Sequence, residues 1–131
     1  MSSRILFISG RLEDARRLSR MLHALPLAVE HVGSLQQARI LLQQNAYSVI
    51  LTEAELPDGT WLDVLDLSRV APHRVEVIVT DPRADARLWA EALNLGAYDL
   101  LAQPFYEPEV CRILSNACSR DAYRGAAMAA V

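Results

Sequence analysis

Short apolar runs alternate with amphipathic segments along the chain. Each apolar run is bounded by turn signals and predicts a buried strand, whereas apolar residues spaced three and four apart predict a helix that packs by one face. The predicted strands cover residues 4–9, 27–32, 47–52, 75–80 and 98–102. The predicted helices cover residues 12–25, 35–44, 61–70, 83–95 and 107–120.

Local signals mark several of these boundaries. Pro26 ends the first helix, Ser34 is a candidate N-cap for the second, and Gly96 follows the fourth as a natural C′ residue. The alternation predicts an α/β fold with a doubly wound, five-stranded parallel sheet of the flavodoxin-like type, because short loops between strands and helices require crossover connections. We expect one domain over residues 1–122 and a C-terminal tail over 123–131, either a frayed helix or disorder.

The carboxyl ends of the predicted strands are the places to search for function, because ligands bind there in doubly wound sheets. The residues at these ends are Ser9, Gly10, Val32, Gly33, Thr52, Glu53, Thr80, Asp81, Ala102 and Gln103. Glu53 ends the third strand within the stretch SVILTEAELPDG. It therefore places a carboxylate at the mouth of the predicted crevice.

The charge and hydropathy of the chain argue against several classes of function. The net charge is −3, all 13 basic residues are Arg, and the chain contains no Lys, which excludes chemistry that requires an ammonium group. The absence of a basic stripe argues against nucleic-acid binding. No apolar stretch approaches the roughly 20 residues of a membrane span. The N-terminus also lacks a signal-peptide layout, so we expect a cytoplasmic protein without membrane association.

The cysteines and histidines form no catalytic or metal-binding pattern. Cys111 and Cys118 lie on one face of a predicted helix, about 10 Å apart along its axis, which is too far for a disulfide. We expect both to be reduced and packed as small apolar residues. His23, His31 and His73 are scattered without ligand spacing, so we expect ordinary surface or edge residues.

Four motifs follow one another in a characteristic order. They are RILFIS in the first strand, VILTEAELPDG in the third strand and its loop, VIVT at the end of the fourth strand, and LGAYDLLAQPF across the fifth. Together they resemble the CheY-like receiver domain of bacterial two-component response regulators, over roughly residues 4–120. The resemblance implies a cis-type turn at Gln103-Pro104, where the family has Lys-Pro-Phe. The resemblance implies the (βα)5 receiver fold and a role in phosphorelay signal transduction.

The resemblance also implies where the family's functional residues would lie. In that family two acidic residues after the first strand hold Mg²⁺, an Asp four residues before a Pro accepts a phosphoryl group, a Ser or Thr ends the fourth strand, and a Lys precedes a Pro after the fifth. The matching positions are Ser9 and Gly10 for the acidic pair, Glu53 for the phosphoacceptor, Thr80 for the hydroxyl and Gln103 for the Lys. The aromatic switch position falls on Leu100. Only Thr80 keeps the family's residue type.

These departures predict a degenerate receiver, a pseudo-receiver without the phosphoacceptor Asp. Mg²⁺ is usually held through carboxylates, waters and phosphates, so we expect weak or no Mg²⁺ binding and no other cofactor. Phosphoryl transfer needs positive charge around the phosphoryl oxygens, and Gln103 brings none, so we expect no phosphorylation at Glu53. Glu13 and Asp14 are expected to complement the first helix dipole rather than to replace the lost acidic pair.

Two residues near the crevice each have two interpretations. Glu53 either imitates a phosphorylated Asp by accepting a hydrogen bond from Thr80, or is a partly solvated carboxylate capped by backbone N–H groups of its own loop. Trp61 either lies across the crevice and shields Glu53, or packs the third helix onto its neighbour.

The resemblance further implies a contact face made of the fourth helix, the fifth strand and the fifth helix. The candidate positions are Arg83, Arg87, Trp89, Glu91, Tyr98, Asp99 and Arg112. Trp89 beside Arg residues has the composition of a contact hot spot, and the alternative is that its own helix covers it. The expected partner is a second copy of the chain or another protein, with a histidine kinase or an output protein as candidates.

We therefore expect a signalling module that is not an enzyme, acts by protein–protein contact and does not depend on phosphorylation. Two alternatives stay open. The first is a receiver that accepts a phosphoryl group at an atypical site, Asp58 or Asp81. The second is a small-ligand binder, because doubly wound sheets often hold nucleotides or flavins at the same edge.

Overall fold

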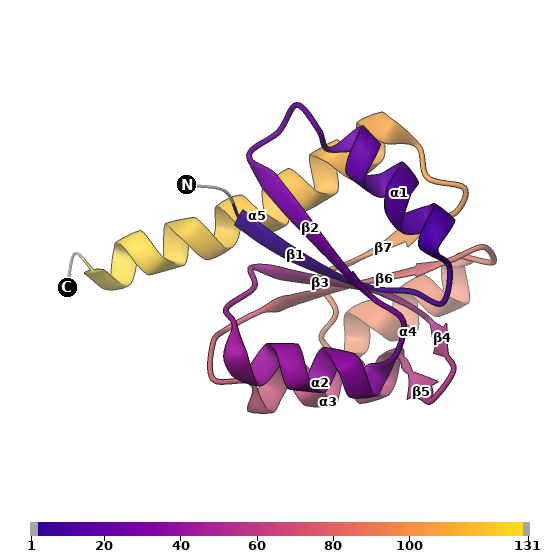
Figure 1. The fold of residues 1–131 in the computed structure, drawn as a ribbon, viewed down its shortest axis with the longest axis horizontal. Coiled ribbons are helices and arrows are strands. Elements are labelled where there is room, and N and C mark those ends of the chain that lie inside the picture. Colours follow the sequence, from indigo (N-terminus) through magenta and orange to yellow (C-terminus); the bar gives the residue numbers. More distant parts are fainter. Residues whose placement is uncertain (1–2, 130–131) are drawn as a thin grey trace.

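The computed structural model describes residues 3–129, with positions 120–129 described by their backbone alone. Five parallel strands form one sheet in the order β2-β1-β3-β6-β7 (Figure 1). These strands are β1 (Ser3–Ile8), β2 (Leu27–Val32), β3 (Val49–Glu53), β6 (Glu76–Asp81) and β7 (Asp99–Ala102). The predicted α/β fold with a five-stranded parallel sheet is confirmed.

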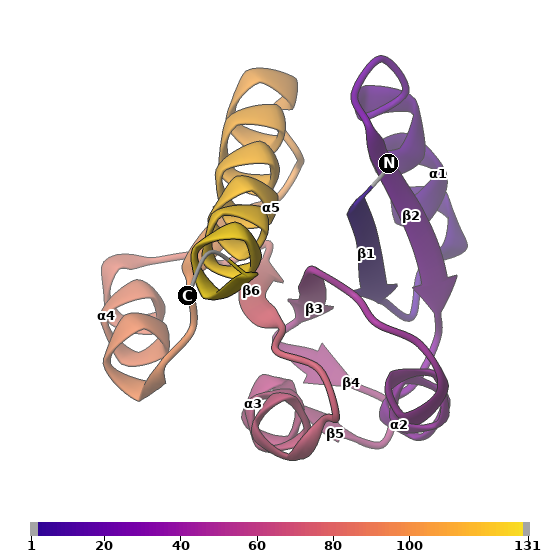
Figure 2. The ribbon, with the colours of Figure 1, turned by 90° about the vertical axis from the view of Figure 1, so that its left-hand side faces the viewer.

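Helices cover both faces of this sheet. They are α1 (Leu12–Met21), α2 (Leu35–Gln44), α3 (Trp61–Val70), α4 (Ala86–Leu95) and α5 (Glu107–Ala129). Helices α1 and α5 lie over one face, and α2, α3 and α4 contribute to the core on the other (Figure 2). Because strand side chains alternate, Leu6 and Ile50 pack toward α2 and α3, whereas Phe7 and Leu51 pack toward α1 and α5.

Capping residues mark the ends of three helices. The Ser34 hydroxyl accepts a hydrogen bond from Gln37 N at 3.2 Å, which confirms the predicted N-cap of α2. Gly96 ends α4 in the left-handed region, with φ of 110°, as expected for a C′ glycine. Thr60 and Asp63 form a reciprocal capping box at α3. Caps of this kind each stabilise a helix by about 1 kcal/mol.

Some predicted boundaries were wrong by several residues. The first helix ends at Met21 instead of residue 25, because Leu22 and Leu25 continue the apolar spacing but enter the core from a turn before Pro26. The fourth helix begins at Ala86 instead of residue 83, because the Asp85 carboxylate caps it by accepting from Leu88 N at 2.9 Å. The second strand has the predicted bounds, and the bounds of the other four differ by one or two residues.

A small hairpin surrounds a turn at Pro57-Asp58. Strands β4 (Glu55–Leu56) and β5 (Gly59–Thr60) pair antiparallel, with Asp58 at the tip. The Asp58 carboxylate accepts hydrogen bonds from Leu35 N at 2.8 Å and Gln36 N at 3.0 Å. These backbone N–H groups hold the pKa of Asp58 below its usual value. The hairpin tip therefore binds the start of α2.

The backbone of α5 stays helical to Ala129, past the predicted helix end at residue 120 (Figure 1). The predicted tail over residues 123–131 includes positions 130 and 131, which lie outside the described residues. The division between domain and tail at residue 122 stays a prediction. Within residues 3–129, no helix combines the length and hydrophobicity needed to cross a bilayer.

Candidate functional site at the carboxyl edge of the sheet

Four polar side chains lie on one face of the sheet at its carboxyl edge. Ser9 and Gln103 directly follow β1 and β7, Glu53 ends β3, and Thr80 is the penultimate residue of β6. Their alternation matches that of Phe7, Leu51, Ile78 and Leu101, which pack toward α1 and α5. In the strand register, the Cα of Glu53 is paired with that of Thr80. We call Ser9, Glu53, Thr80 and Gln103 the edge cluster.

Ser9 is the hydrogen-bond partner of Glu53. Its hydroxyl donates to Glu53 Oε1 and accepts from Arg11 N at 3.0 Å. Ser9 is fully buried and Glu53 is half-buried, so the bond lies at the boundary between core and solvent. Ser9, the position that the resemblance implies for a Mg²⁺ ligand, thus donates to Glu53, the position that it implies for the phosphoacceptor.

The other two members of the edge cluster each have a buried side-chain atom without a hydrogen-bond partner among the described residues. Thr80 is fully buried, and its Oγ1 has no hydrogen-bond partner in the described part of the chain. The same holds for Gln103 Nε2. The interpretation that Glu53 accepts a hydrogen bond from Thr80 is therefore wrong, because the Glu53 carboxylate accepts from Ser9 instead. The other interpretation, capping by backbone N–H groups of its own loop, also differs from the structure, in which the donor is a serine hydroxyl.

The remaining positions implied by the family resemblance lack its chemistry. Leu100, at the switch position, is buried in the core that faces α4. Gly10 is exposed, with open space where a side chain would lie. Among the described residues no group of three or more His, Cys, Asp or Glu side chains is arranged to hold a metal ion. Glu13 and Asp14 lie in the first turn of α1, as predicted.

A pocket of about 200 Å³ opens beside the edge cluster, between the start of α1 and the loop after β7. We call it the α1–α5 pocket, and its lining residues are Arg11, Asp14, Arg17, Pro82, Gln103, Pro104 and Phe105. The Gln103-Pro104 peptide bond is cis, as the resemblance implies. Sequence reasoning missed Arg11 and Arg17, although their positions around the start of a helix that follows a strand end were a signal.

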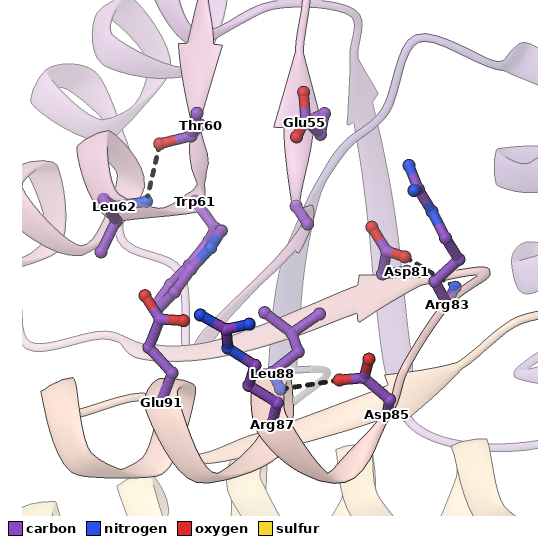
Figure 3. A pocket seen from close by; sticks show the side chains of 11 residues that line it. Glu55, Thr60, Trp61, Leu62, Asp81, Arg83, Asp85, Arg87, Leu88 and Glu91 are labelled. Carbon is purple, nitrogen blue, oxygen red and sulfur yellow. Dashed lines mark hydrogen bonds between the residues drawn. The ribbon is translucent and has the colours of Figure 1, made fainter.

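A larger groove of about 350 Å³ lies on the opposite face of the sheet, between the β4–β5 hairpin and α4 (Figure 3). Trp61, Leu88, Arg83, Arg87 and Asp81 are among its lining residues. Trp61 is only 6% exposed and belongs to the core under α3, which agrees with the packing interpretation. The Asp81 carboxylate accepts from Arg83 N at 2.6 Å. Asp81 therefore lies away from the edge cluster.

The predicted contact residues divide between two sides of α4. Arg83, Arg87 and Glu91 line the groove toward the hairpin, and Figure 3 shows Arg87 and Glu91 beside Trp61. Trp89 is 50% exposed and lines a surface hollow with Leu100 and Ala102 of β7, so its own helix does not cover it. Tyr98 and Asp99 are half-buried at the start of β7, and Arg112 is exposed on α5.

His31 has a structural role that its sequence context did not indicate. Its Nε2 lies 2.8 Å from the carbonyl oxygen of Ser9, and its ring packs on Phe7 with centroids 5.9 Å apart. His31 thus helps to hold the chain segment that presents Ser9 to Glu53.

No protein-family model matches the chain. The swarming motility regulation protein RssB of Serratia marcescens is 28% identical over 106 residues, which cover 81% of this chain and 48% of that protein. The chain spans less than half the length of the curated relatives it matches.

Solved structures match over nearly the whole chain. The signal receiver domain of an HD domain-containing protein from Pseudomonas fluorescens has a TM-score of 0.82 and 22% identity, covering 94% of this chain and 91% of that one. The fold is that of a CheY-like receiver domain. The receiver domain of the sensor histidine kinase PA1611 from Pseudomonas aeruginosa has a TM-score of 0.78 and 25% identity, covering 91% and 99%, and coordinates magnesium in its active-site cleft. The chain resembles a two-component response regulator receiver in sequence and in fold.

Proposed function

We propose that this receiver-like chain is a signalling module that acts by protein–protein contact and is not switched by phosphorylation. The observation that carries the proposal is the hydrogen bond from Ser9 to Glu53. A receiver keeps that space for a metal ion and a phosphoryl group, whereas here a neutral hydroxyl fills it.

The charges around the edge cluster support the same conclusion. Mg²⁺ binding depends on carboxylate ligands, and Glu53 is the only carboxylate of the edge cluster. A phosphoryl group on Glu53 would need cationic groups to offset its charge. The position implied for the family's Lys holds Gln103, and the chain has no Lys. Arg11 and Arg17 line a pocket with Gln103, but neither forms an ion pair with Glu53 among the described residues.

The two other acidic candidates are engaged by the backbone. Both oxygens of Asp58 accept from the first residues of α2, and Asp81 caps its own turn on the opposite face of the sheet. Phosphorylation of Asp58 would break contacts that hold the hairpin. The hydrogen bonds of Asp58 and Asp81 therefore argue against phosphorylation at either residue and favour signalling by protein–protein contact.

Incubation of the full chain with Mg²⁺ and acetyl phosphate tests the proposal. We expect no phosphorylated species by intact mass spectrometry. The matched control is the variant Ser9→Asp, Gly10→Asp, Glu53→Asp, Gln103→Lys, which rebuilds the family's residue types where Gly10 has open space. This variant should regain Mg²⁺ binding. A phosphorylated wild-type chain, at Glu53, Asp58 or Asp81, would contradict the proposal.

The contact surface in this proposal is the face of α4, β7 and α5. Its exposed apolar side chains are Trp89 at 50%, Leu93 at 38% and Tyr106 at 66%. Exposed aromatic side chains flanked by charged groups are typical of contact hot spots. A second copy of the chain, a histidine kinase or an output protein is the proposed occupant.

A matched pair of variants tests this surface. Sedimentation velocity measures self-association, and two-hybrid assays against the kinases and output proteins of the source genome measure other contacts. Trp89→Ala should weaken the interaction about tenfold or more. Ile40→Ala, at another exposed apolar residue, on α2 and 53% exposed, should leave it unchanged. If Trp89→Ala keeps every interaction of the wild type, the surface is not the contact face.

A further inference from the structure

The α1–α5 pocket contains two arginines that form no ion pair within the described residues. The pocket has a volume of about 200 Å³, enough for a small ion with part of its hydration shell or a few further atoms. Arg11 and Arg17 both line it, and within the described residues neither guanidinium forms an ion pair. Asp14 is the one acidic residue in the lining. The pocket therefore has a net positive charge.

Two further groups at this place favour an anion. Gln103 lines the pocket, and its Nε2 is a buried donor without a partner in the described chain. Buried donors are rarely left unsatisfied, so such an atom marks a place where a ligand or water accepts. The ten-residue helix α1 also begins here, and its N-cap Arg11 forms no side-chain cap. The start of a helix carries partial positive charge and exposed N–H groups.

We propose that the α1–α5 pocket binds a tetrahedral oxyanion, the phosphate group of either inorganic phosphate or a small phosphomonoester. Two arginines and Gln103 line the pocket, so guanidinium and amide donors are both present at its wall. A carboxylate offers only two coplanar oxygens, whereas phosphate offers at least three oxygens in a tetrahedral array, and Arg binds it by paired hydrogen bonds. The net positive charge of the pocket attracts an anion, whereas a magnesium site attracts a cation. The inference does not rest on the proposed function.

Titration of the full chain with sodium phosphate tests the inference, with chemical shifts followed by ¹⁵N-HSQC in EDTA and with NaCl matching the ionic strength. Saturable shifts are expected at the Gln103 side-chain amide and in the first turn of α1. Arg17→Gln should weaken binding about tenfold, because it removes a charge-assisted hydrogen bond. Gln103→Glu replaces the donor with a carboxylate of the same shape and should abolish binding.

Arg16→Gln is the matched control, because Arg16 is adjacent in sequence but lines a different surface, beside His31. It should change the affinity less than about twofold. Asp14→Asn should raise the affinity about threefold by removing the opposing charge. Thermal unfolding of each variant verifies that the fold is kept. Equal weakening by Arg16→Gln and Arg17→Gln would mean general electrostatic attraction and would overturn the proposal, as would shifts that do not saturate by about 50 mM phosphate.

A second titration with glycerol 3-phosphate separates the two sources of the phosphate group. Tighter binding of the ester than of phosphate would identify a small organic phosphomonoester as the ligand class. Equal or weaker binding of the ester would identify the free ion. Either outcome supports the oxyanion site, provided that Arg17→Gln loses the binding.

Discussion

Two glutamates on the same sheet have opposite surroundings. Glu30 on β2 accepts from the Arg4 guanidinium through Oε1 and from the Tyr47 hydroxyl through Oε2 at 2.6 Å. The Arg4 guanidinium also lies over the Tyr47 ring, with its carbon 4.8 Å from the centroid. Glu53 on β3 accepts from one neutral hydroxyl, that of Ser9, and belongs to a cluster in which Thr80 Oγ1 and Gln103 Nε2 have no hydrogen-bond partner among the described residues.

The hydrogen bonds around Glu30 shift the pKa values of Glu30 and Tyr47. The hydrogen bond from Arg4, followed by that from Tyr47, lowers the pKa of Glu30 below its ordinary value. Burial, reinforced by the hydrogen bond to Glu30, raises the pKa of Tyr47 to about 12. Each polar group there satisfies another, so that cluster contributes to stability. The edge cluster leaves donors unsatisfied, which costs stability and marks a place adapted for recognition.

The largest expected effect of this comparison concerns Tyr47 at high pH. A group with a raised folded pKa contributes stability that is complete below its unfolded pKa and is lost as the pH rises through the folded value. The free energy of unfolding, measured by urea at each pH, should fall by about 2 to 3 kcal/mol between the ordinary pKa of 10 and about 12.

Tyr47→Phe should remove this fall, because no proton is then left to titrate at that position. Tyr106→Phe is the control, since Tyr106 is 66% exposed, and it should keep the fall. The same pH dependence in wild type and Tyr47→Phe would mean that the Glu30 cluster does not hold the phenol.

The next largest effect is expected at the hydrogen bond between Ser9 and Glu53. Ser9→Ala leaves the half-buried Glu53 carboxylate without its hydroxyl donor and should lower the free energy of unfolding by about 2 kcal/mol. A double-mutant cycle with Glu53→Ala, measured by chemical denaturation, should give a coupling energy of about 1 kcal/mol or more. Additive effects of the two substitutions would show that the pair does not interact.

The sequence predicted much of the fold because its signals are local. Ser34 and Gly96 mark helix ends through their own side chain or backbone, and both act as predicted. The apolar spacing of Leu22 and Leu25 misled because burial alone does not separate a helix from a turn that enters the core. The β4–β5 hairpin was missed because strands of two residues are too short to show alternation.

The edge cluster was predictable in position but not in bonding. Strand ends alone place Ser9, Glu53, Thr80 and Gln103 at one edge. Which hydroxyl reaches Glu53 depends on ångström-scale distances between strands, and the sequence offered both Ser9 and Thr80. The α1–α5 pocket forms only when the start of α1 meets the loop after β7, a contact between residues far apart in the chain.

Two buried threonines sharpen the comparison at a smaller scale. Thr52 and Thr80 are both fully buried near strand ends, but Thr52 Oγ1 donates to the Glu53 carbonyl oxygen at 2.9 Å, whereas Thr80 Oγ1 has no partner within the described residues. Replacement by Val keeps the shape and removes the hydroxyl. Thr52→Val should destabilise by about 1 kcal/mol, and Thr80→Val should stabilise by about 1 kcal/mol. Loss of stability in both variants, measured by urea unfolding, would mean that Thr80 is bonded in solution.

The smallest effect is the acid counterpart of the Tyr47 prediction. Because the folded pKa of Glu30 lies below its ordinary value of 4.5, its contribution to stability is present above that pH and is lost as the pH falls through the lowered value. The Arg4 and Glu30 side chains are each 38% exposed, so solvent screening should limit this loss to less than about 1 kcal/mol. Glu30→Gln should flatten the urea-unfolding profile below pH 4.5, whereas Glu13→Gln, at an exposed residue of α1, should not. If Glu30→Gln left the acid profile unchanged, Arg4 and Tyr47 would not stabilise the ionised Glu30 carboxylate, and the contrast between the two clusters would rest on the buried phenol alone.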